Sequence, residues 1–366
     1  MPSCLIGLGS NLGDRRAMLD AAVARLARHP AIAVTAQSPW FETSPVGGPP
    51  GQPLFLNGAA VVETSLSPQA LLEVLQDIEA ALGRRPGPRW DKRPIDLDLL
   101  LYQELVLSTP SLVLPHPRMA WRRFVLKPAA LVAGDMVHPT IGWTVARLFE
   151  HLDTATPYVA ITGSIGAGKT QLAGRLAAQL DAPLLAEPLD LKQLEAFYAD
   201  PASQAWNTEL QFLHVRTRLL ASGSSPWTAE ATPVDTALSA EQRSRQPKQR
   251  LVISDFWFDQ SLAFARVWLP PEQSAAFRRQ WEQSRHQVVQ PKLTVVLDAP
   301  AEELLQRILR RGRRCERNLT VKQLEQIRQS IRTQASAVGL GPVLYINTSD
   351  WEAASAEALA AIEAMQ

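Results

Sequence analysis

A glycine-rich turn in the middle of the chain limits most strongly what this sequence can fold into. The segment Gly163-Ser-Ile-Gly-Ala-Gly168-Lys169-Thr170 follows a short apolar run at 158–162 and precedes a segment with helical spacing. There, glycines let backbone N–H groups converge on phosphate oxygens, a lysine reaches the β- and γ-phosphates, and a threonine hydroxyl can ligate Mg²⁺. The segment predicts a phosphate-binding loop that opens an α/β unit. Its expected ATP ligands are Gly163, Gly166, Gly168 and Lys169, and its expected metal ligand is Thr170.

The sequence indicates that a second domain begins just before this loop. A polar stretch ending at Pro157 precedes the apolar run, and 366 residues correspond to about two domains of ordinary size. We expect one domain over 1–155 and a second over 156–366. Residues 222–250 are rich in Ser, Thr, Pro and Gln and poor in large apolar side chains, which predicts a mobile surface insertion.

The order of strand and helix patterns differs between the two parts. The first part predicts strand, helix, strand, strand, helix, strand, at 4–8, 15–28, 32–41, 56–64, 67–82 and 95–102. That order favours an α+β sandwich of ferredoxin-like type. The second part alternates strands and helices, which favours a parallel sheet with covering helices. The overall class is therefore α/β, with an α+β domain followed by a P-loop domain.

Composition excludes several classes of protein. The 37 Lys+Arg nearly balance the 36 Asp+Glu, so a net charge of +1 gives no general attraction to nucleic acid or to an anionic membrane. No apolar run is long enough to cross a membrane, and the start lacks the pattern of a signal peptide, so we expect a cytoplasmic protein. Two cysteines, Cys4 and Cys315, are too few for a disulfide framework or a zinc site, and we expect free thiols.

A pair of carboxylates carries the chemistry expected of the first part. Asp96 and Asp98 are two apart on a predicted strand, so both face one side, while Leu97, Leu99 and Leu101 face the core. Such a pair calls for a cation, and Mg²⁺ shared with substrate phosphates fits. The upstream segment adds charge for polyphosphate oxygens through Arg84, Arg85, Arg89 and Arg93. With Trp90 alongside, these residues favour a metal–nucleotide site over a solvated charged surface.

The first part resembles the 6-hydroxymethyl-dihydropterin pyrophosphokinases of folate synthesis over about residues 4–145. Seven ordered motifs carry the resemblance: Gly-Leu-Gly-Ser-Asn-Leu-Gly-Asp at 7–14, Phe-Glu-Thr-Ser-Pro-Val-Gly-Gly at 41–48, Phe-Leu-Asn at 55–57, Gln-Asp-Ile-Glu at 76–79, Trp90, Arg-Pro-Ile-Asp-Leu-Asp at 93–98, and Leu-Pro-His-Pro-Arg at 114–118. The resemblance implies transfer of a diphosphoryl group from ATP to the hydroxymethyl oxygen of a reduced pterin, which leaves AMP.

The same resemblance implies roles for individual residues. Asp96 and Asp98 would hold two Mg²⁺, and Arg84 and Arg93 would stabilise charge on the transferring group. The implied nucleotide ligands are Gln76, Glu79, His116 and Arg122. The implied pterin pocket is Thr43, Pro45, Val46, Phe55, Asn57, Trp90 and Phe124, which suits a flat heterocycle with amide groups.

The second part resembles the deoxynucleoside kinases over about residues 158–346. The motifs are Ala-Glu-Pro at 186–188, Phe-Tyr-Ala-Asp-Pro at 197–201, Ile-Ser-Asp at 253–255, and an arginine-rich segment that contains Arg307, Arg311, Arg313 and Glu316. The resemblance implies that Glu187 is the general base for a sugar 5′-hydroxyl and that Asp255 assists at the metal or the sugar. It implies that the three arginines close over the phosphoryl group, with Arg307 and Arg313 on ATP. The implied nucleoside contacts are Tyr198, Glu209, Arg216 and Glu316.

One position departs from that family. Counting from Tyr198 without gaps puts Glu209 where the family has a base-reading glutamine, and Gln211 could substitute only with a local shift. Two alternatives therefore stay open: the second part is an inert kinase-like module for binding or for dimerisation, or it phosphorylates another small hydroxyl compound. We expect ATP as co-substrate, two Mg²⁺ in the first site and one in the second. The expected partners are a reduced pterin and a deoxynucleoside, with no nucleic acid and no membrane, and a homodimer formed through the second domain.

Overall fold

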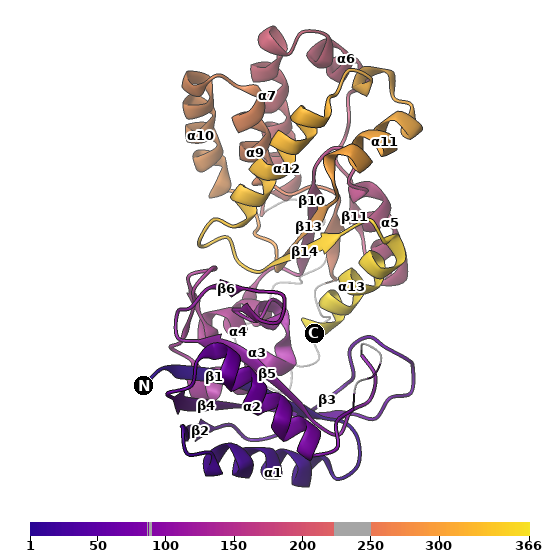
Figure 1. Ribbon diagram of the computed structural model, residues 1–366. Helices are drawn as coiled ribbons and strands as arrows, with labels where there is room; N and C mark the ends of the chain where they lie inside the picture. Colours follow the sequence, from indigo (N-terminus) through magenta and orange to yellow (C-terminus); the bar gives the residue numbers. More distant parts are fainter. Residues whose placement is uncertain (86, 88–89, 223–249) are drawn as a thin grey trace, which may run out of the picture. The chain divides into compact units, whose positions relative to one another are not determined.

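The computed structural model describes residues 1–85, 87, 90–222 and 250–366 (Figure 1). The predicted insertion, apart from residues 222 and 250, lies outside the described residues, as do three positions of the basic loop. The described chain groups into two compact units. Unit 1 contains residues 1–154, 337–342 and 356–366, and unit 2 contains residues 155–336 and 343–355.

Unit 1 is built on an antiparallel sheet of order β2-β4-β1-β5, with β3 paired to β4. Its strands are β1 (Ser3–Ser10), β2 (Ile32–Gln37), β3 (Phe41–Thr43), β4 (Phe55–Thr64) and β5 (Asp96–Tyr102). Two helices join them, α1 (Arg15–Arg28) and α2 (Pro68–Ala81). This order confirms the predicted ferredoxin-like sandwich. The expected strand at 32–41 is divided in two, because Ser38-Pro-Trp40 interrupts the ladder.

Local signals explain where the two helices begin. The Asp14 side chain accepts a hydrogen bond from the Ala17 N–H at the start of α1, and the Ser67 side chain accepts one from the Ala70 N–H at the start of α2. Pro68 occupies the first turn of α2, where its missing N–H costs nothing. The buried leucines of both helices pack with the sheet in one core cluster, which includes Leu19, Leu26, Leu71 and Leu75.

The pleat of β5 changes at a bulge. Asp96 and Asp98 pair with Gly9 and Gly7 of β1, and the register then shifts opposite Leu5 and Ile6. Leu97 and Leu99 belong to the core cluster as expected, whereas Tyr102 joins it in place of Leu101. The extra residue of a bulge reverses the alternation, and this could not be seen in the sequence.

The remaining elements of unit 1 are short or follow the sheet. They are β6 (Leu107–Ser108), β7 (Val113–Leu114), the 3-10 turn Met119–Trp121, α3 (Arg123–Ala133), β8 (Val137–His138), β9 (Trp143–Thr144) and α4 (Val145–Thr154). Helix α3 packs on β4 and α4. The segment between β7 and α3 carries His116, Arg118 and Arg122, and the His116 N–H donates to the Leu100 carbonyl at 2.8 Å. That bond ties the segment to β5.

Unit 2 contains a fully parallel five-stranded sheet of order β11-β12-β10-β13-β14. The strands are β10 (Tyr158–Gly163), β11 (Leu184–Leu185), β12 (Val252–Ser254), β13 (Leu293–Asp298) and β14 (Val343–Asn347). Its helices are α5 (Lys169–Gln179), α6 (Leu191–Ala199), α7 (Pro201–Leu220), α9 (Gln260–Trp268), α10 (Pro271–Arg285), α11 (Ala301–Arg311), α12 (Val321–Ala335) and the start of α13 (Trp351–Ala364). A 3-10 turn covers Arg314–Glu316. This confirms the predicted P-loop fold.

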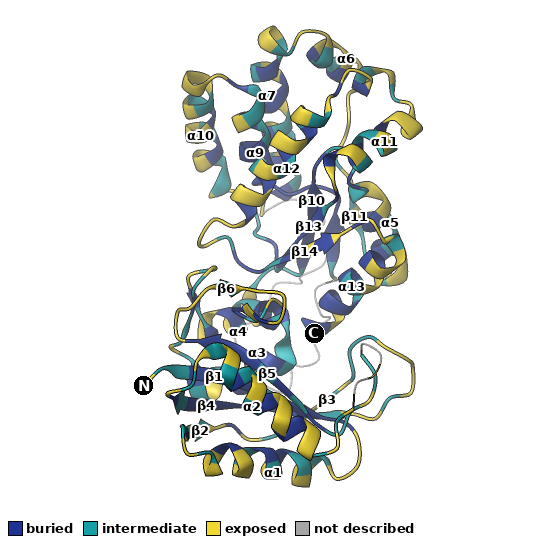
Figure 2. Ribbon diagram, in the orientation of Figure 1, coloured by how far each residue is buried: buried dark blue, intermediate teal, exposed yellow. Residues whose placement is uncertain are grey.

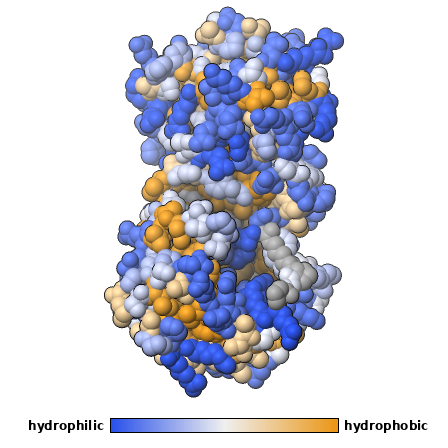
Figure 3. Space-filling view, viewed as in Figure 1, coloured by the Kyte–Doolittle hydropathy of each residue, from blue (hydrophilic) through white to orange (hydrophobic). Residues whose placement is uncertain are grey.

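Burial follows the two sheets. The strands are largely dark blue in Figure 2, and β10 is buried along its whole length. The face seen in Figure 3 is mostly hydrophilic, with hydrophobic side chains in separate patches. Both cysteines are free thiols, Cys4 in the core and Cys315 partly exposed. Within the described ranges, no helix is both long and apolar enough to span a bilayer.

Candidate functional sites

The carboxylate pair of unit 1 lies on one face of β5. Asp96 and Asp98 are both partly exposed and alternate with the buried Leu97 and Leu99. The opposite positions on β1 are Gly9 and Gly7, so no side chain of that strand fills the space beside the carboxylates. Burial, followed by the charge of Asp98, raises the pKa of Asp96. Two carboxylates on one face of a strand repel each other, and a cation bound beside them relieves that repulsion.

Arginines and a buried glutamate surround Asp96. The Arg84 guanidinium contacts the carboxylates of both Glu79 and Asp96, and Arg93 Nη1 lies 3.1 Å from Asp96 Oδ2. Glu79 is buried and also accepts a hydrogen bond of 2.6 Å from the Leu97 N–H. Burial raises the pKa of Glu79 to about 7, against the opposite effects of that N–H and of Arg84. Glu79 therefore holds the Arg84 guanidinium and the Leu97 N–H of β5 in position.

Asp98 has no arginine contact of that kind among the described residues, and it faces the segment before α3. His116 Nε2 lies 3.9 Å from Asp98 Oδ1. Burial lowers the pKa of His116, so its neutral form is favoured, and burial lowers the pKa of Arg122 to about 10. The charge of Asp98 acts on both groups in the opposite direction. The Asp98 carboxylate is therefore available to bind a ligand, and His116 and Arg122 lie near it.

The donor set fits Mg²⁺ that is shared with a substrate. Among the described residues, no group of three or more His, Cys, Asp or Glu side chains could hold a metal ion alone. Mg²⁺ is commonly bound by one or two carboxylates together with waters and substrate phosphates, and the Asp96–Asp98 pair supplies that number. Because Arg84 and Arg93 already contact Asp96, Asp98 is the more accessible of the two ligands.

The expected pterin residues come together at the neighbouring end of the sheet. Asn57 Nδ2 donates to Thr43 Oγ1 at 2.7 Å, and Thr43 pairs with Phe55 across β3 and β4. A Cβ on Gly9 would lie 2.9 Å from Asn57 Oδ1, so only glycine leaves that amide its place. Asn57 and Asp96 occupy facing positions on either side of Gly9, which puts the amide and the carboxylate in one row of the sheet.

Trp90, in the basic loop, packs beside the other expected pterin residues. A Cβ on Gly47 would lie 3.2 Å from the indole of Trp90, and Gln52 Nε2 donates to the Trp90 carbonyl at 3.0 Å. Trp90 has a positive φ of 65°, an uncommon backbone conformation for a large side chain. The loop that contains the half-buried Pro45 and Val46 is therefore packed against the tryptophan.

Phe124 and Gln76 are two further residues that were expected to bind substrate. Phe124 is partly exposed, with the Arg122 guanidinium 5.5 Å from its ring centre, and Gln76 is exposed on α2 one turn before Glu79.

Two residues that position others in the site were not predicted from the sequence. Asn11 Oδ1 accepts from the Arg93 N–H at 2.8 Å, and Gln52 holds Trp90. The asparagine stands in the Gly-Ser-Asn motif, so that motif could have indicated it.

In unit 2 the phosphate-binding loop joins β10 to α5. Gly163, Gly166 and Gly168 all have positive φ, and a Cβ on Gly166 would meet the Leu304 carbonyl at 2.9 Å. Lys169 Nζ donates to the Gly163 and Ser164 carbonyls at 3.0 and 3.1 Å. Burial lowers the pKa of Lys169 to about 8, with Glu187 and Asp255 acting in the opposite direction. The loop has the glycine conformations and the lysine that a phosphate site requires.

The ends of two strands, β11 and β12, lie beside that loop. Thr170 Oγ1 donates to Asp255 Oδ2 at 2.7 Å, and the Glu187 N–H donates to Asp255 Oδ1 at 2.7 Å. Asp255 follows β12 and Glu187 follows β11, so both lie at the carboxyl edge of the parallel sheet. A threonine hydroxyl and an aspartate at the end of a phosphate-binding loop suit one Mg²⁺ bound together with nucleotide phosphates.

Glu187 is held by a buried arginine. Arg216 Nε lies 2.6 Å from Glu187 Oε1, and Arg216 Nη1 donates to Ser261 Oγ at 2.8 Å. The two charged side chains are only 5% and 11% exposed, so water screens their attraction little. Ser261, at the start of α9 (Gln260–Trp268), was not expected to contribute to the site. The pair fixes the carboxylate next to Asp255 and the phosphate loop.

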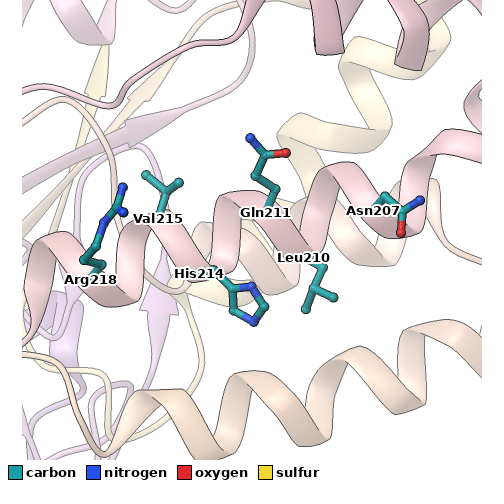
Figure 4. Close-up of a pocket in the computed structure, with 6 residues that line it drawn as sticks. All are labelled: Asn207, Leu210, Gln211, His214, Val215 and Arg218. Atoms are coloured by element: carbon teal, nitrogen blue, oxygen red, sulfur yellow. The ribbon is translucent and has the colours of Figure 1, made fainter.

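Helix α7 separates Glu209 from Gln211. Glu209 and Arg216 are buried and lie seven residues apart, on the same side of the helix. Gln211 is exposed and lines an open pocket of about 370 Å³ with Asn207, Leu210, His214, Val215 and Arg218 (Figure 4). The helix would have to turn by a large angle to exchange the two residues, so the local shift considered from the sequence does not occur.

The three arginines expected to close over the phosphoryl group fall into two groups by their contacts. Arg311 and Arg313 both contact Glu316, and the charge of Arg311 acts on Lys169 and on Tyr198. Arg307 instead donates to the Thr348 carbonyl at 2.7 Å and pairs with Glu303. Helix α6, which carries Tyr198, packs against α7 and against the Arg314–Glu316 turn, and the charges of Glu316 and Glu209 act on the Tyr198 phenol. The expected role of Arg307 on ATP stays a prediction.

Comparison with known proteins agrees with this division. A family model described as 7,8-dihydro-6-hydroxymethylpterin-pyrophosphokinase matches residues 5–134. The 2-amino-4-hydroxy-6-hydroxymethyldihydropteridine pyrophosphokinase of Methylorubrum extorquens is 47% identical over 42% of this chain and 95% of its own length. The enzyme of the same name from Bacillus subtilis is 50% identical over 34% of this chain and 74% of its own length.

The second unit has its own match. A family model described as deoxynucleoside kinase covers residues 159–363, more than half of the chain. A deoxyadenosine kinase structure from M. mycoides is 15% identical over 55% of this chain and 96% of its own, with a TM-score of 0.44. The chain therefore belongs to the pyrophosphokinase family through its N-terminal part and to the deoxynucleoside kinase family through its C-terminal part.

Proposed function

We propose that unit 1 performs its family's diphosphoryl transfer from ATP to the hydroxymethyl group of a reduced pterin through the Asp96–Asp98 face of β5. The observation that carries the proposal is the single row in which Asn57, Gly9 and Asp96 lie. It puts a pterin-type amide partner and a carboxylate on the same side of the sheet. A heterocycle held at Asn57 and Thr43 would direct a substituent toward the carboxylates.

The proposed roles follow from the contacts. Asp96 and Asp98 hold two Mg²⁺, which when bound neutralise the phosphate oxygens on which charge develops. Arg93 and Arg84 leave Asp96 for the phosphates as ATP arrives, and Arg122 and His116 bind the nucleotide beside Asp98 with Gln76. Glu79 positions Arg84. The pterin lies between Phe55, Phe124 and Trp90, against Pro45 and Val46, with Thr43 and Asn57 on its polar edge.

For unit 2 we propose transfer of the ATP γ-phosphate to the 5′-hydroxyl of a deoxynucleoside. The observation that supports it is the Glu187 carboxylate, fixed by Arg216 at the edge of the sheet where Lys169, Thr170 and Asp255 meet. Glu187 accepts the proton of the attacking hydroxyl. Lys169 and the glycine loop bind the phosphates, Thr170 holds one Mg²⁺, and Arg311 and Arg313 stabilise charge on the transferring group. Tyr198, Glu209 and Glu316 contact the nucleoside.

Three further expectations stay predictions. They are a domain boundary near residue 155, a homodimer formed through the C-terminal domain, and a cytoplasmic location. Light scattering of the purified chain tests the second. ATP and Mg²⁺ are general requirements of both families, and metal titration of each site tests the proposed numbers of two ions and one.

The pyrophosphokinase site is tested by Asp98→Asn in the full chain. The change keeps the shape of the side chain and removes its charge, so pterin-dependent AMP formation falls by at least about 10²-fold because a metal ligand is lost. The matched control is Asp135→Asn, since Asp135 is exposed on another segment of unit 1. AMP release by Asp98→Asn at the rate of the control would contradict the assignment.

The kinase site is tested by measuring ADP formation with the four deoxynucleosides, each with and without reduced pterin. We expect at least one deoxynucleoside to stimulate ADP release. An inert module would release none with any of them. Stimulation only by another hydroxyl compound would favour the remaining alternative, a P-loop kinase of different specificity.

A further inference from the structure

Helix α7 buries a carboxyl group that has no partner among the described residues. Glu209 is 3% exposed, and no described side chain or backbone group gives it a hydrogen bond or an ion pair. Buried carboxyl groups are nearly always hydrogen-bonded, because an unmet bond costs free energy. An unpartnered, buried polar side chain in a candidate site points to a ligand that completes it.

The neighbours of Glu209 explain why no cation neutralises it. On its own helix the facing cation is Arg216, which is already bound to Glu187 and Ser261. Helix α6 presents Tyr198, whose phenol is influenced by the Glu209 charge. Asp259, which directly precedes α9, and Arg285 of α10 pair with each other at 3.4 Å. Glu187 adds a second negative charge near Glu209.

We propose that Glu209 binds the base of the nucleoside as a protonated carboxylic acid, with its O–H donating and its C=O accepting. The proposal rests on the nucleoside kinase function proposed above. A carboxylic acid offers one donor and one acceptor side by side, as a glutamine amide does. The ligand it fits is a heterocyclic edge with an adjacent acceptor and donor, such as a ring nitrogen beside an amino group.

The electrostatic setting agrees with this geometry. Burial raises the pKa of Glu209 to about 8 and the charge of Glu187 acts in the same direction, while Arg216 opposes them. At neutral pH the carboxyl group therefore carries its proton. Above pH 8 it becomes an acceptor-only carboxylate and loses the donor.

The test is nucleoside affinity against pH in the full chain, without ATP. Calorimetry with deoxyadenosine and deoxycytidine, whose bases do not titrate between pH 6.5 and 9.5, gives the dissociation constants. For the wild type we expect affinity to fall about tenfold per pH unit above 8. Glu209→Gln should bind without this decline, because the amide keeps donor and acceptor at every pH. Glu209→Leu should bind at least about tenfold more weakly throughout.

Two controls show whether the pH dependence and the effects of the variants come from Glu209 itself. Lys169 also titrates near pH 8, but it binds phosphate and is not involved when only nucleoside is present. Pterin-dependent AMP formation should be equal in all variants, which shows that unit 1 is unaffected by the substitutions. The proposal is overturned if Glu209→Gln binds as weakly as Glu209→Leu, or if it keeps the alkaline decline of the wild type.

An infrared measurement covers the case in which no deoxynucleoside binds. That result would contradict the proposed kinase function, whereas the state of Glu209 would still be measurable. A protonated carboxyl group has a C=O stretching band that a carboxylate lacks. We expect the absorbance of this band at pH 7 to be lower in Glu209→Gln than in the wild type, and a band of equal intensity in the two proteins would overturn the proposal.

Discussion

At the residue scale, the carboxylates of the two sites are neutralised in different ways. Asp96 is shared between Arg84 and Arg93, whereas Asp98 has His116 at 3.9 Å and the charge of Arg122 nearby. Glu187, in contrast, is locked to one buried arginine. A carboxylate that must bind a metal needs a free face, whereas a general base needs a fixed position, and the two environments correspond to these needs.

Glu187→Gln tests the general base. The amide still accepts the hydrogen bond from Arg216, so the position of the side chain is kept, but it cannot accept the hydroxyl proton. We expect kcat with the active nucleoside to fall by at least about 10²-fold and KM to change little. The control is Glu302→Gln, at an exposed position of α11. An unchanged kcat in Glu187→Gln would exclude it as the base.

At the element scale, β1 leaves room for both ligand groups through its glycines. A Cβ on Gly9 would lie 2.9 Å from Asn57 Oδ1, whereas a Cβ on Gly7 would meet only the flexible end of Leu100, at 3.3 Å. The two positions share a strand and a face but differ in what an added methyl group would contact.

This difference gives a matched pair of variants. Gly9→Ala should displace the Asn57 amide and raise KM for the pterin by about tenfold, which corresponds to about 1.4 kcal/mol. Gly7→Ala should leave KM unchanged, because Leu100 can adjust its rotamer. Steady-state kinetics with varied pterin measure both values, and equal KM for the two variants would show that Asn57 does not contact the pterin.

Much of the architecture could be predicted because apolar spacing and turn signals are local. The bounds of α1 agree with the expected 15–28, and those of α2 lie within one residue of the expected 67–82. Features that depend on distant partners could not be predicted. They include the bulge that puts Tyr102 in the core, the Thr348 carbonyl that holds Arg307, and the burial of Glu209. Spacing identified the candidate residues, but their partners came only from the fold.

At the scale of the whole molecule, two units with separate sheets each carry a nucleotide site. Residues 356–366, at the end of the chain, group with unit 1, where Glu357 pairs with Arg118 at 3.1 Å. Cutting the chain at residue 155 would therefore remove part of unit 1. Point variants in the full chain are the better way to separate the activities.

The most direct test is the product pattern of Lys169→Ala in the full chain, with ATP, reduced pterin and the active deoxynucleoside together. The change removes the phosphate-binding ammonium of unit 2 and touches no described residue of the Asp96–Asp98 face. We predict that ADP formation dependent on the nucleoside is lost and that AMP formation dependent on the pterin continues at the wild-type rate. Loss of both products together, or retention of both, would contradict two independent phosphotransfer sites.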